Sequence, residues 1–292
     1  MIGSGDMEVF FNKTSIGYKH IKEGKPCQDY SDCYKNDECT ILTACDGHGG
    51  ALYIRSDRGA KFASAAAIKV LKRHLLQKIP KKYPNELIDK IRLEILCEWN
   101  NLVEQDYAIY PFEEGEMASL TSEQKFELEG DYTLAYGTTL HAVCITDELC
   151  CCVSIGDGGI FYVTDDGVFG SAFQDDDNEP VANMTYSLCS ENAFNKIDIQ
   201  YLVMLKGYVT GIVLCTDGAT NPYLSYDNFT KSFLAPMLKK VDKDGNEVIP
   251  ELMGFIDKLG GKIGTGDDVS VALYYRRSTD EHKSSNGGFI LK

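Results

Sequence analysis

Short apolar segments that run directly into an acid-glycine turn are the feature that most constrains the fold of this chain. The segment Ile41–Cys45 leads into Asp46–Gly50, whose sequence is DGHGG. Glycine tolerates left-handed backbone angles and lets a ligand approach the main chain closely. A carboxylate and an imidazole are therefore predicted on a turn at the end of a buried strand, where a rigid scaffold commonly presents functional groups.

Three more acids lie beside apolar, strand-like segments, and a fourth precedes a polar segment. They are Asp157 after Cys151–Ile155, Asp217 after Gly211–Cys215, Asp267 before Val269–Tyr275, and Asp29 before the polar segment Ser31–Glu38. Any one of the Asp-Gly pairs could be an ordinary hairpin turn. Together they predict a carboxylate cluster, which needs countercharge because neighbouring buried carboxylates resist ionising together. Hard divalent cations that prefer oxygen ligands, Mg²⁺ or Mn²⁺, would supply that charge.

Composition restricts the classes of partner. The chain has 292 residues, 43% of them hydrophobic, and a net charge of −15. Nucleic acids and anionic membranes are attracted by basic patches, so neither is expected as the main partner. No apolar run approaches the ~20 residues that span a bilayer, and Met1–Val9 lacks the pattern of a signal peptide. We therefore expect a cytoplasmic protein, and nothing in the sequence requires more than a monomer.

The 11 cysteines invite a metal-site interpretation that their spacing does not support. Cys27, Cys33, Cys39 and Cys45 recur every six residues, but no CxxC pair occurs, and zinc sites typically use closely spaced pairs. We interpret the cysteines as reduced and mostly buried, because disulfides are rare without export signals.

Hydrophobic periodicity predicts antiparallel sheets with helices packed outside, because strands precede and follow a block of helices rather than alternating with them. We expect an irregular acidic insertion over residues 110–130, a polar loop over 174–196, a domain over 1–277 and a polar tail over 278–292. Strands are predicted at Met7–Ser15, Cys39–Cys45, Thr133–Thr146, Leu149–Ile155, Tyr201–Lys206, Gly211–Cys215 and Val269–Tyr275, and helices at Ser56–Gln77 and from Asn85.

Six short motifs follow one another between about Gly17 and Tyr275. They are Gln28-Asp29, DGHGG at 46–50, YGTT at 136–139, IGDG at 155–158, CTDG at 215–218 and GDDVSV at 266–271. In this order the chain resembles the metal-dependent serine/threonine protein phosphatases, the PPM family (type 2C), in a bacterial-type variant. The resemblance implies an α+β fold, a four-layer α-β-β-α sandwich of two antiparallel sheets flanked by helices.

The resemblance also implies a mechanism. Phosphoserine or phosphothreonine on a protein substrate would be hydrolysed by water activated by two Mg²⁺ or Mn²⁺ ions. His48 would be the general acid for the leaving alkoxide, and Asp46 and Asp29 would act with it in catalysis. The implied metal ligands are Asp46 as the bridge, the Gly47 carbonyl, Asp217, Asp267, Asp29 through a bound water, and Asp157 for a third, weaker ion.

The chain departs from the family pattern where the phosphate would bind. Gly24 stands near the position of the usual phosphate-binding arginine, and Gln28 replaces a common glutamate. Lys25 or His20 is the candidate replacement, with Arg55 or Arg58 as more distant sources of positive charge. This loss leaves open a second hypothesis, a catalytically weak or inactive relative that serves as a binding or regulatory module.

Overall fold

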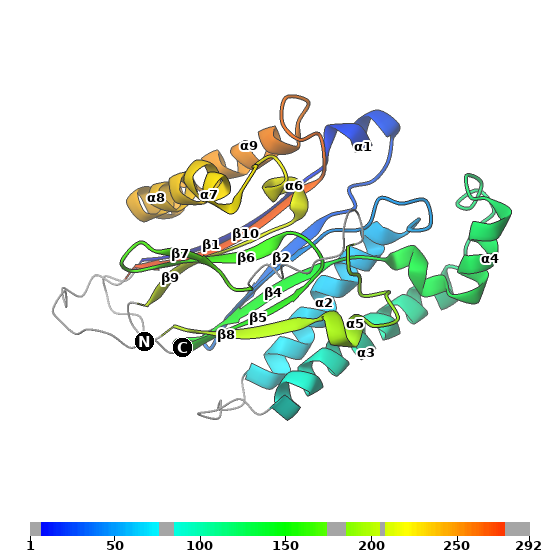
Figure 1. Ribbon diagram of the computed structural model, residues 1–292, viewed down its shortest axis with the longest axis horizontal. Helices are drawn as coiled ribbons and strands as arrows, with labels where there is room; N and C mark the ends of the chain where they lie inside the picture. Colours follow the sequence, from blue (N-terminus) through cyan, green and yellow to red (C-terminus); the bar gives the residue numbers. More distant parts are fainter. Residues whose placement is uncertain (1–6, 76–84, 174–184, 205–207, 278–292) are drawn as a thin grey trace.

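The computed structural model describes residues 7–75, 85–173, 185–204 and 208–277. Within these residues, two five-stranded antiparallel sheets stack face to face, and helices cover both outer faces (Figure 1). The predicted four-layer sandwich is therefore confirmed. The tail over 278–292 and the part of the polar loop over 174–184 lie outside the described residues.

The first sheet brings the two ends of the described chain together as neighbouring strands. Its order is β1-β10-β9-β6-β7, and the order of the second sheet is β2-β3-β4-β5-β8. The first sheet comprises β1 (Met7–Ser15), β10 (Val269–Arg277), β9 (Val209–Cys215), β6 (Gly159–Thr164) and β7 (Phe169–Ser171). The second comprises β2 (Tyr30–Lys35), β3 (Thr40–Cys45), β4 (Leu140–Ile145), β5 (Leu149–Ile155) and β8 (Asp198–Val203).

The longer helices pack on opposite sides of the sandwich (Figure 1). Helices α2 (Ser56–Leu75) and α3 (Asn85–Ile109) cover the second sheet, and α8 (Ala235–Asp244) and α9 (Ile249–Gly260) cover the first. The shorter ones are α1 (Tyr18–Glu23), α4 (Ser122–Gly130), α5 (Ala193–Lys196), α6 (Asp217–Thr220) and α7 (Tyr226–Phe229), with 3₁₀ turns at Tyr132–Tyr136 and Gly245–Val248 and a π turn at Thr230–Leu234. No helix in the described part of the chain is long and apolar enough to cross a membrane.

Three apolar layers hold the sandwich together. Trp99 of α3 is fully buried against α2, where its Nε1 donates to the Gly59 carbonyl (3.2 Å), Leu42 and Ile212 are buried between the sheets, and Phe233 is buried among the helices on the first sheet. Burying each such side chain contributes about 1.5–3 kcal/mol. These layers make the sheets a rigid support for the turns at their edge.

Several segments differ from the sequence prediction, among them β8, which begins at Asp198 rather than at Tyr201. The expected strand Thr133–Thr146 begins only at Leu140, because Asp131 caps a preceding 3₁₀ turn by accepting a bond from the Thr133 amide (2.9 Å). The acidic insertion contains α4, which starts with a reciprocal capping box between Thr121 and Gln124. The last two differences arise from local side-chain capping, which satisfies the free amides at a helix start.

Candidate active site

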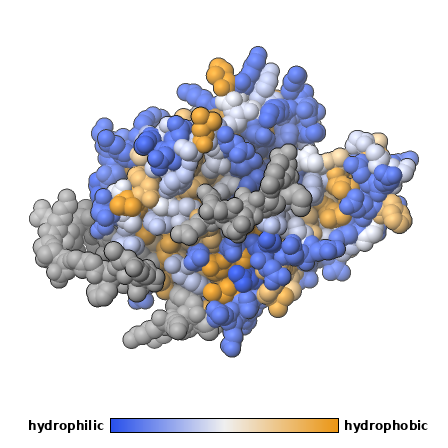
Figure 2. Space-filling model, in the orientation of Figure 1, coloured by the Kyte–Doolittle hydropathy of each residue, from blue (hydrophilic) through white to orange (hydrophobic). Residues whose placement is uncertain are grey.

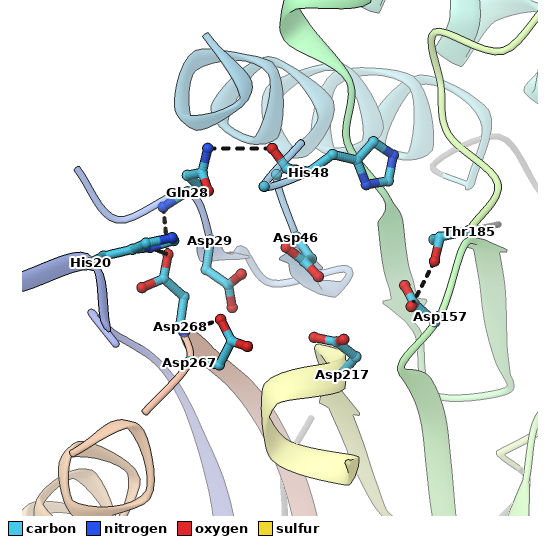
Figure 3. A pocket seen from close by; sticks show the side chains of 12 residues that line it. His20, Gln28, Asp29, Asp46, His48, Asp157, Thr185, Asp217, Asp267 and Asp268 are labelled. Atoms are coloured by element: carbon cyan, nitrogen blue, oxygen red, sulfur yellow. Dashed lines mark hydrogen bonds and ion pairs between the residues drawn. The ribbon is translucent and has the colours of Figure 1, made fainter. Parts of the chain in front are cut away.

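A cavity of about 250 Å³ opens where the turns after β3, β5 and β9 meet the segments before β2 and β10. Figure 3 shows the carboxylates converging on it from these separate elements. Six of the described lining residues are aspartates, and none is a lysine or an arginine. The described lining comprises His20, Gln28, Asp29, Asp46, Gly47, His48, Gly49, Asp157, Thr185, Asp217, Asp267 and Asp268.

The turn after β3 is fixed by the YGTT segment that precedes β4. The Asp46 amide donates to Thr139 Oγ1 (2.9 Å), and its carbonyl accepts from the Thr139 amide (2.8 Å) and from Thr138 Oγ1 (2.9 Å). Gly47 must be glycine, because a Cβ there would lie 2.6 Å from the Gln28 carbonyl oxygen. Two of the predicted motifs therefore act as one unit that orients Asp46.

Asp46, Asp157 and Asp217 form a close acidic group. Each offers a carboxylate oxygen, and these oxygens all lie within 4.8 Å of one another. Burial, followed by repulsion from Asp29 and Asp217, raises the pKa of Asp46 well above its usual range. Burial and the Asp157 charge also raise the pKa of Asp217. The group is short of positive charge, as the sequence predicts for a cation site.

Asp157 is held by a residue that sequence reasoning missed. His141 is fully buried in β4, and its Nε2 lies 2.6 Å from the Asp157 carbonyl oxygen. Because that carbonyl can only accept, Nε2 carries the proton, and the Ser154 hydroxyl donates to Nδ1 (2.9 Å). Burial lowers the pKa of His141. A lone histidine in an apolar strand gave no sequence signal for this role.

Asp29 is a buried carboxylate, with 4% of its surface exposed. Burial raises its pKa to about 8, although Thr216 Oγ1 donates a hydrogen bond to its carboxyl group (2.7 Å). The same Thr216 oxygen accepts from the Ser270 amide (2.9 Å). Asp29 is thus tied to the starts of both α6 and β10.

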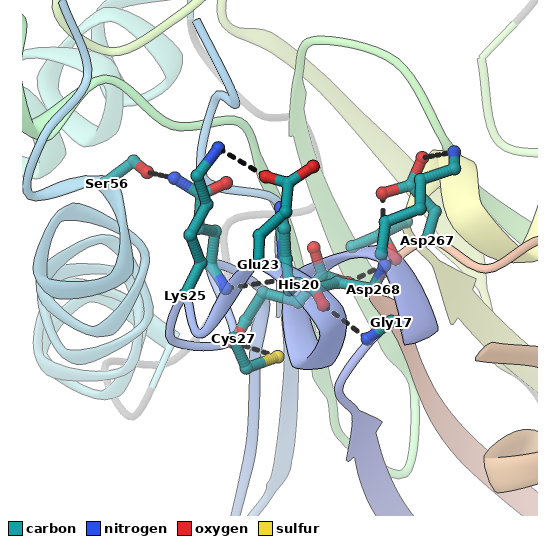
Figure 4. A network of polar contacts seen from close by, with 12 residues as sticks. Gly17, His20, Glu23, Lys25, Cys27, Ser56, Asp267 and Asp268 are labelled. Atoms are coloured by element: carbon teal, nitrogen blue, oxygen red, sulfur yellow. Dashed lines mark hydrogen bonds and ion pairs between the residues drawn. The ribbon is translucent and has the colours of Figure 1, made fainter. Parts of the chain in front are cut away.

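The acid pair before β10 divides into an exposed and a buried member. Asp267 is half exposed and pairs with Lys19 (3.2 Å). Asp268 is buried and accepts bonds from the amides of Gly17 (2.6 Å) and Gln28 (2.6 Å) and from His20 Nδ1 (2.9 Å), as Figure 4 shows. Asp268 therefore anchors α1 and the segment before β2 beside the cavity, a role that the sequence did not indicate.

In Figure 3, His20 lies beside Asp268 at the left of the carboxylates, and the His48 ring lies above them on the side of Asp157. The His48 ring lies 4.8 Å from the Tyr53 ring, and burial lowers its pKa. Gln28 Nε2 donates to the His48 carbonyl (3.3 Å) and to Ser56 Oγ (2.7 Å). A glutamate could not donate these bonds, so the replacement at position 28 has a structural function in this chain.

The other candidate cations lie away from the described lining. Lys25 pairs with Glu23 (2.8 Å), and both are half exposed (Figure 4). Arg55 is buried and forms a bidentate ion pair with Glu116 (2.6 and 2.7 Å). Arg58 pairs with Asp106 (2.9 Å).

Comparison with known families identifies the chain. The family model for protein phosphatase 2C matches residues 16–255. The chain therefore belongs to the protein phosphatase 2C family, and its family and structural neighbours are serine/threonine phosphatases. The resemblance carried by the six motifs is confirmed. A comparison with curated proteins found no match.

Solved structures share the fold at low sequence identity. The catalytic domain of the serine/threonine phosphatase PstP, in complex with two manganese ions, has a TM-score of 0.55 at 15% identity, covering 94% of this chain and 100% of that chain. Stp1 from Staphylococcus aureus has a TM-score of 0.54 at 14% identity, covering 94% and 96%. A phosphatase 2C from Toxoplasma gondii has a TM-score of 0.57 at 12% identity, covering 95% and 96%.

Proposed function

We propose that this protein hydrolyses phosphoserine and phosphothreonine on protein substrates in a reaction that depends on two Mg²⁺ or Mn²⁺ ions, with room for a third. The observation that carries the proposal is the group formed by Asp46, Asp157 and Asp217, whose carboxylate oxygens lie within 4.8 Å of one another. The manganese ions in the PstP structure and the family match support it.

The donor set fits such ions. Carboxylate and carbonyl oxygens are the ligands that Mg²⁺ and Mn²⁺ prefer, and burial followed by repulsion from neighbouring carboxylates raises the pKa of Asp46 and Asp217, which a bound cation would relieve. When bound, the ions would neutralise the phosphate and lower the pKa of a water molecule. The residues proposed to hold them are Asp46, Asp217, Asp267, Asp157, Asp29 and the Gly47 carbonyl.

The two histidines of the cavity are proposed to act on the substrate. His48 would give its proton to the serine or threonine alkoxide as it leaves, and burial, which lowers the pKa of His48, makes its protonated form a stronger acid. Of the two candidate phosphate-binding groups, His20 lines the cavity, whereas Lys25 is not among the described lining residues. We therefore favour His20 for contact with the phosphate.

A direct test measures p-nitrophenyl phosphate hydrolysis with Mn²⁺, in the presence and absence of EDTA, together with Mn²⁺ binding by calorimetry. Asp46→Asn should abolish turnover and weaken Mn²⁺ binding, because the bridging carboxylate is lost. Asp227→Asn is the matched control, since Asp227 is an exposed surface acid on α7. Full activity in excess chelator would refute metal dependence.

A binding or regulatory module is the second candidate function. It is favoured by the lack of lysine and arginine among the described residues that line the cavity. Mn²⁺ binding without turnover of nitrophenyl phosphate or phosphopeptides would select this alternative.

A further inference from the structure

A second cavity, of about 480 Å³, adjoins the catalytic cavity. Asp267 lines both, so the two hollows share a wall. Lys19 of α1, Pro222 after α6, Leu259 of α9 and Ile263 in the loop after α9 also line the second cavity. We call it the Ile263 cavity.

The wall of the Ile263 cavity is held in place by backbone bonds. The Thr265 amide donates to the Leu259 carbonyl (2.8 Å), and the Gly264 amide donates to the Gly261 carbonyl (3.0 Å). The Lys19 amide donates to the Gly266 carbonyl (2.9 Å), which ties α1 to the same loop. A wall that is already ordered loses little conformational entropy when a ligand binds.

The rim of this cavity exposes apolar side chains. Ile263 is fully exposed, as is Leu224 two residues after Pro222. Tyr18 and Ile21 of α1 are also exposed, at 36% and 58%. Figure 2 shows hydrophobic residues standing out from a largely hydrophilic surface at the top of the view, where α9 and the loop after it lie. Clustered exposed apolar residues often mark an interaction site.

Four lysines lie on the elements around this cavity, and one of them, Lys19, pairs with Asp267 of the lining (3.2 Å). Lys19 and Lys22 lie on α1, and Lys258 and Lys262 lie at the end of α9 and in the loop that follows. Lys262 Nζ lies 5.8 Å from the centre of the Tyr18 ring, so the two elements meet. Within the described residues Lys22, Lys258 and Lys262 form no ion pair, so in a chain with a net charge of −15 they are the groups that complement an anionic polypeptide.

We propose that the Ile263 cavity binds the part of the substrate polypeptide next to the phosphorylated residue, and that it favours an aliphatic side chain in an acidic context. The inference rests on the proposed function, which places the phosphate in the catalytic cavity. A polypeptide whose phosphate lies in the catalytic cavity must extend over the rim of that cavity. The wall that contains Asp267 continues into the Ile263 cavity. The apolar lining fits an aliphatic side chain of the substrate, and the lysines fit acidic residues around it.

The test compares Ile263→Ser with Ile109→Ser, a control at an exposed isoleucine that ends α3 and lines neither described cavity. Substrates are p-nitrophenyl phosphate and acidic phosphothreonine peptides with one leucine moved through the flanking positions. In the wild-type protein, one leucine position should raise kcat/KM by about tenfold, the size expected for a hydrophobic pocket. Ile263→Ser should remove that gain by raising KM for the favoured peptide, and it should leave p-nitrophenyl phosphate turnover unchanged. Ile109→Ser should retain the tenfold gain.

Three outcomes would overturn the inference: no dependence on leucine position, an unchanged preference in Ile263→Ser, or equal losses on both substrates. A wild-type protein that fails to hydrolyse p-nitrophenyl phosphate refutes the proposed function instead. In that case, fluorescence anisotropy with the labelled peptides still tests the cavity, because Ile263→Ser should weaken binding of the favoured peptide about tenfold, and unchanged binding would refute it.

Discussion

Asp29 is the buried carboxyl group whose replacement tests the electrostatics of the site most directly. Its pKa is raised from 3.8 to about 8, chiefly by burial and then by the Asp268 charge. At neutral pH it is therefore protonated in the folded metal-free protein and ionised in the unfolded chain. Asn has the shape of a protonated Asp, and its carbonyl oxygen can still accept the bond from Thr216 Oγ1. We predict that Asp29→Asn stabilises the metal-free protein.

The magnitude follows from proton linkage. Because the folded-state pKa of Asp29 is raised, the folded protein binds more protons than the unfolded chain between pH 3.8 and about 8, and its stability falls with rising pH over that window. At about 1.4 kcal/mol per pH unit, the raised pKa of Asp29 lowers the free energy of unfolding at pH 7 by about 4 kcal/mol relative to its value below pH 3.8. This is the upper limit of the gain on replacement by Asn, and it corresponds to a rise of several degrees in Tm, at roughly 2 °C per kcal/mol.

The assay is urea and thermal unfolding of both proteins in EDTA at several pH values. The advantage of Asp29→Asn should vanish near pH 4, grow with pH and level off above pH 8. Asp227→Asn, at an exposed position, should show no such trend. A variant less stable than the wild type at pH 7, or a difference that does not change with pH, would refute the reasoning.

Three further predictions concern the same region. His48→Ala should slow phosphopeptide hydrolysis more than p-nitrophenyl phosphate hydrolysis, whose leaving group needs little protonation, and equal losses in kcat would remove His48 from the acid role. Gly47→Ala should lower stability by about 1–3 kcal/mol because its Cβ meets two backbone groups, and an unchanged Tm would contradict this. Glu116→Gln should cost about 1–3 kcal/mol, because the buried Arg55 guanidinium loses its closest carboxylate and keeps only the Asp106 carboxylate of the described residues, at 3.8 Å; denaturant unfolding would reveal the loss, with Glu123→Gln on the exposed face of α4 as the neutral control.

Much of the fold could be predicted because its signals are local. The apolar runs at Met7–Ser15, Leu149–Ile155 and Val269–Tyr275 became strands β1, β5 and β10. Helix α1 and strand β2 were missed, since α1 is only six residues long and β2 is mostly polar, with Ser31 as its one buried residue. Such short elements are stabilised by contacts with distant segments, which no local pattern records.

The functional site was likewise predictable only where its signals are local. The six motifs identified the acids and His48, because each motif is a short strand-turn unit. They could not reveal His141 beneath Asp157 or Asp268 beneath α1, since these bonds join residues that are 16 to 251 positions apart. Nor could the sequence show that Arg55 forms an ion pair with Glu116 or that His20 lines the cavity.

The sequence by itself determined which groups this protein can use: aspartates and a histidine on glycine turns at strand ends, within a chain of antiparallel strands and flanking helices. The tertiary structure decided which of them meet. Strand order and register bring Asp46, Asp157 and Asp217 within 4.8 Å and separate the half-exposed Asp267 from the buried Asp268. The physical reason is that local propensity acts over a few residues, whereas carboxylate repulsion, burial and countercharge depend on distances that only the packed sheets set.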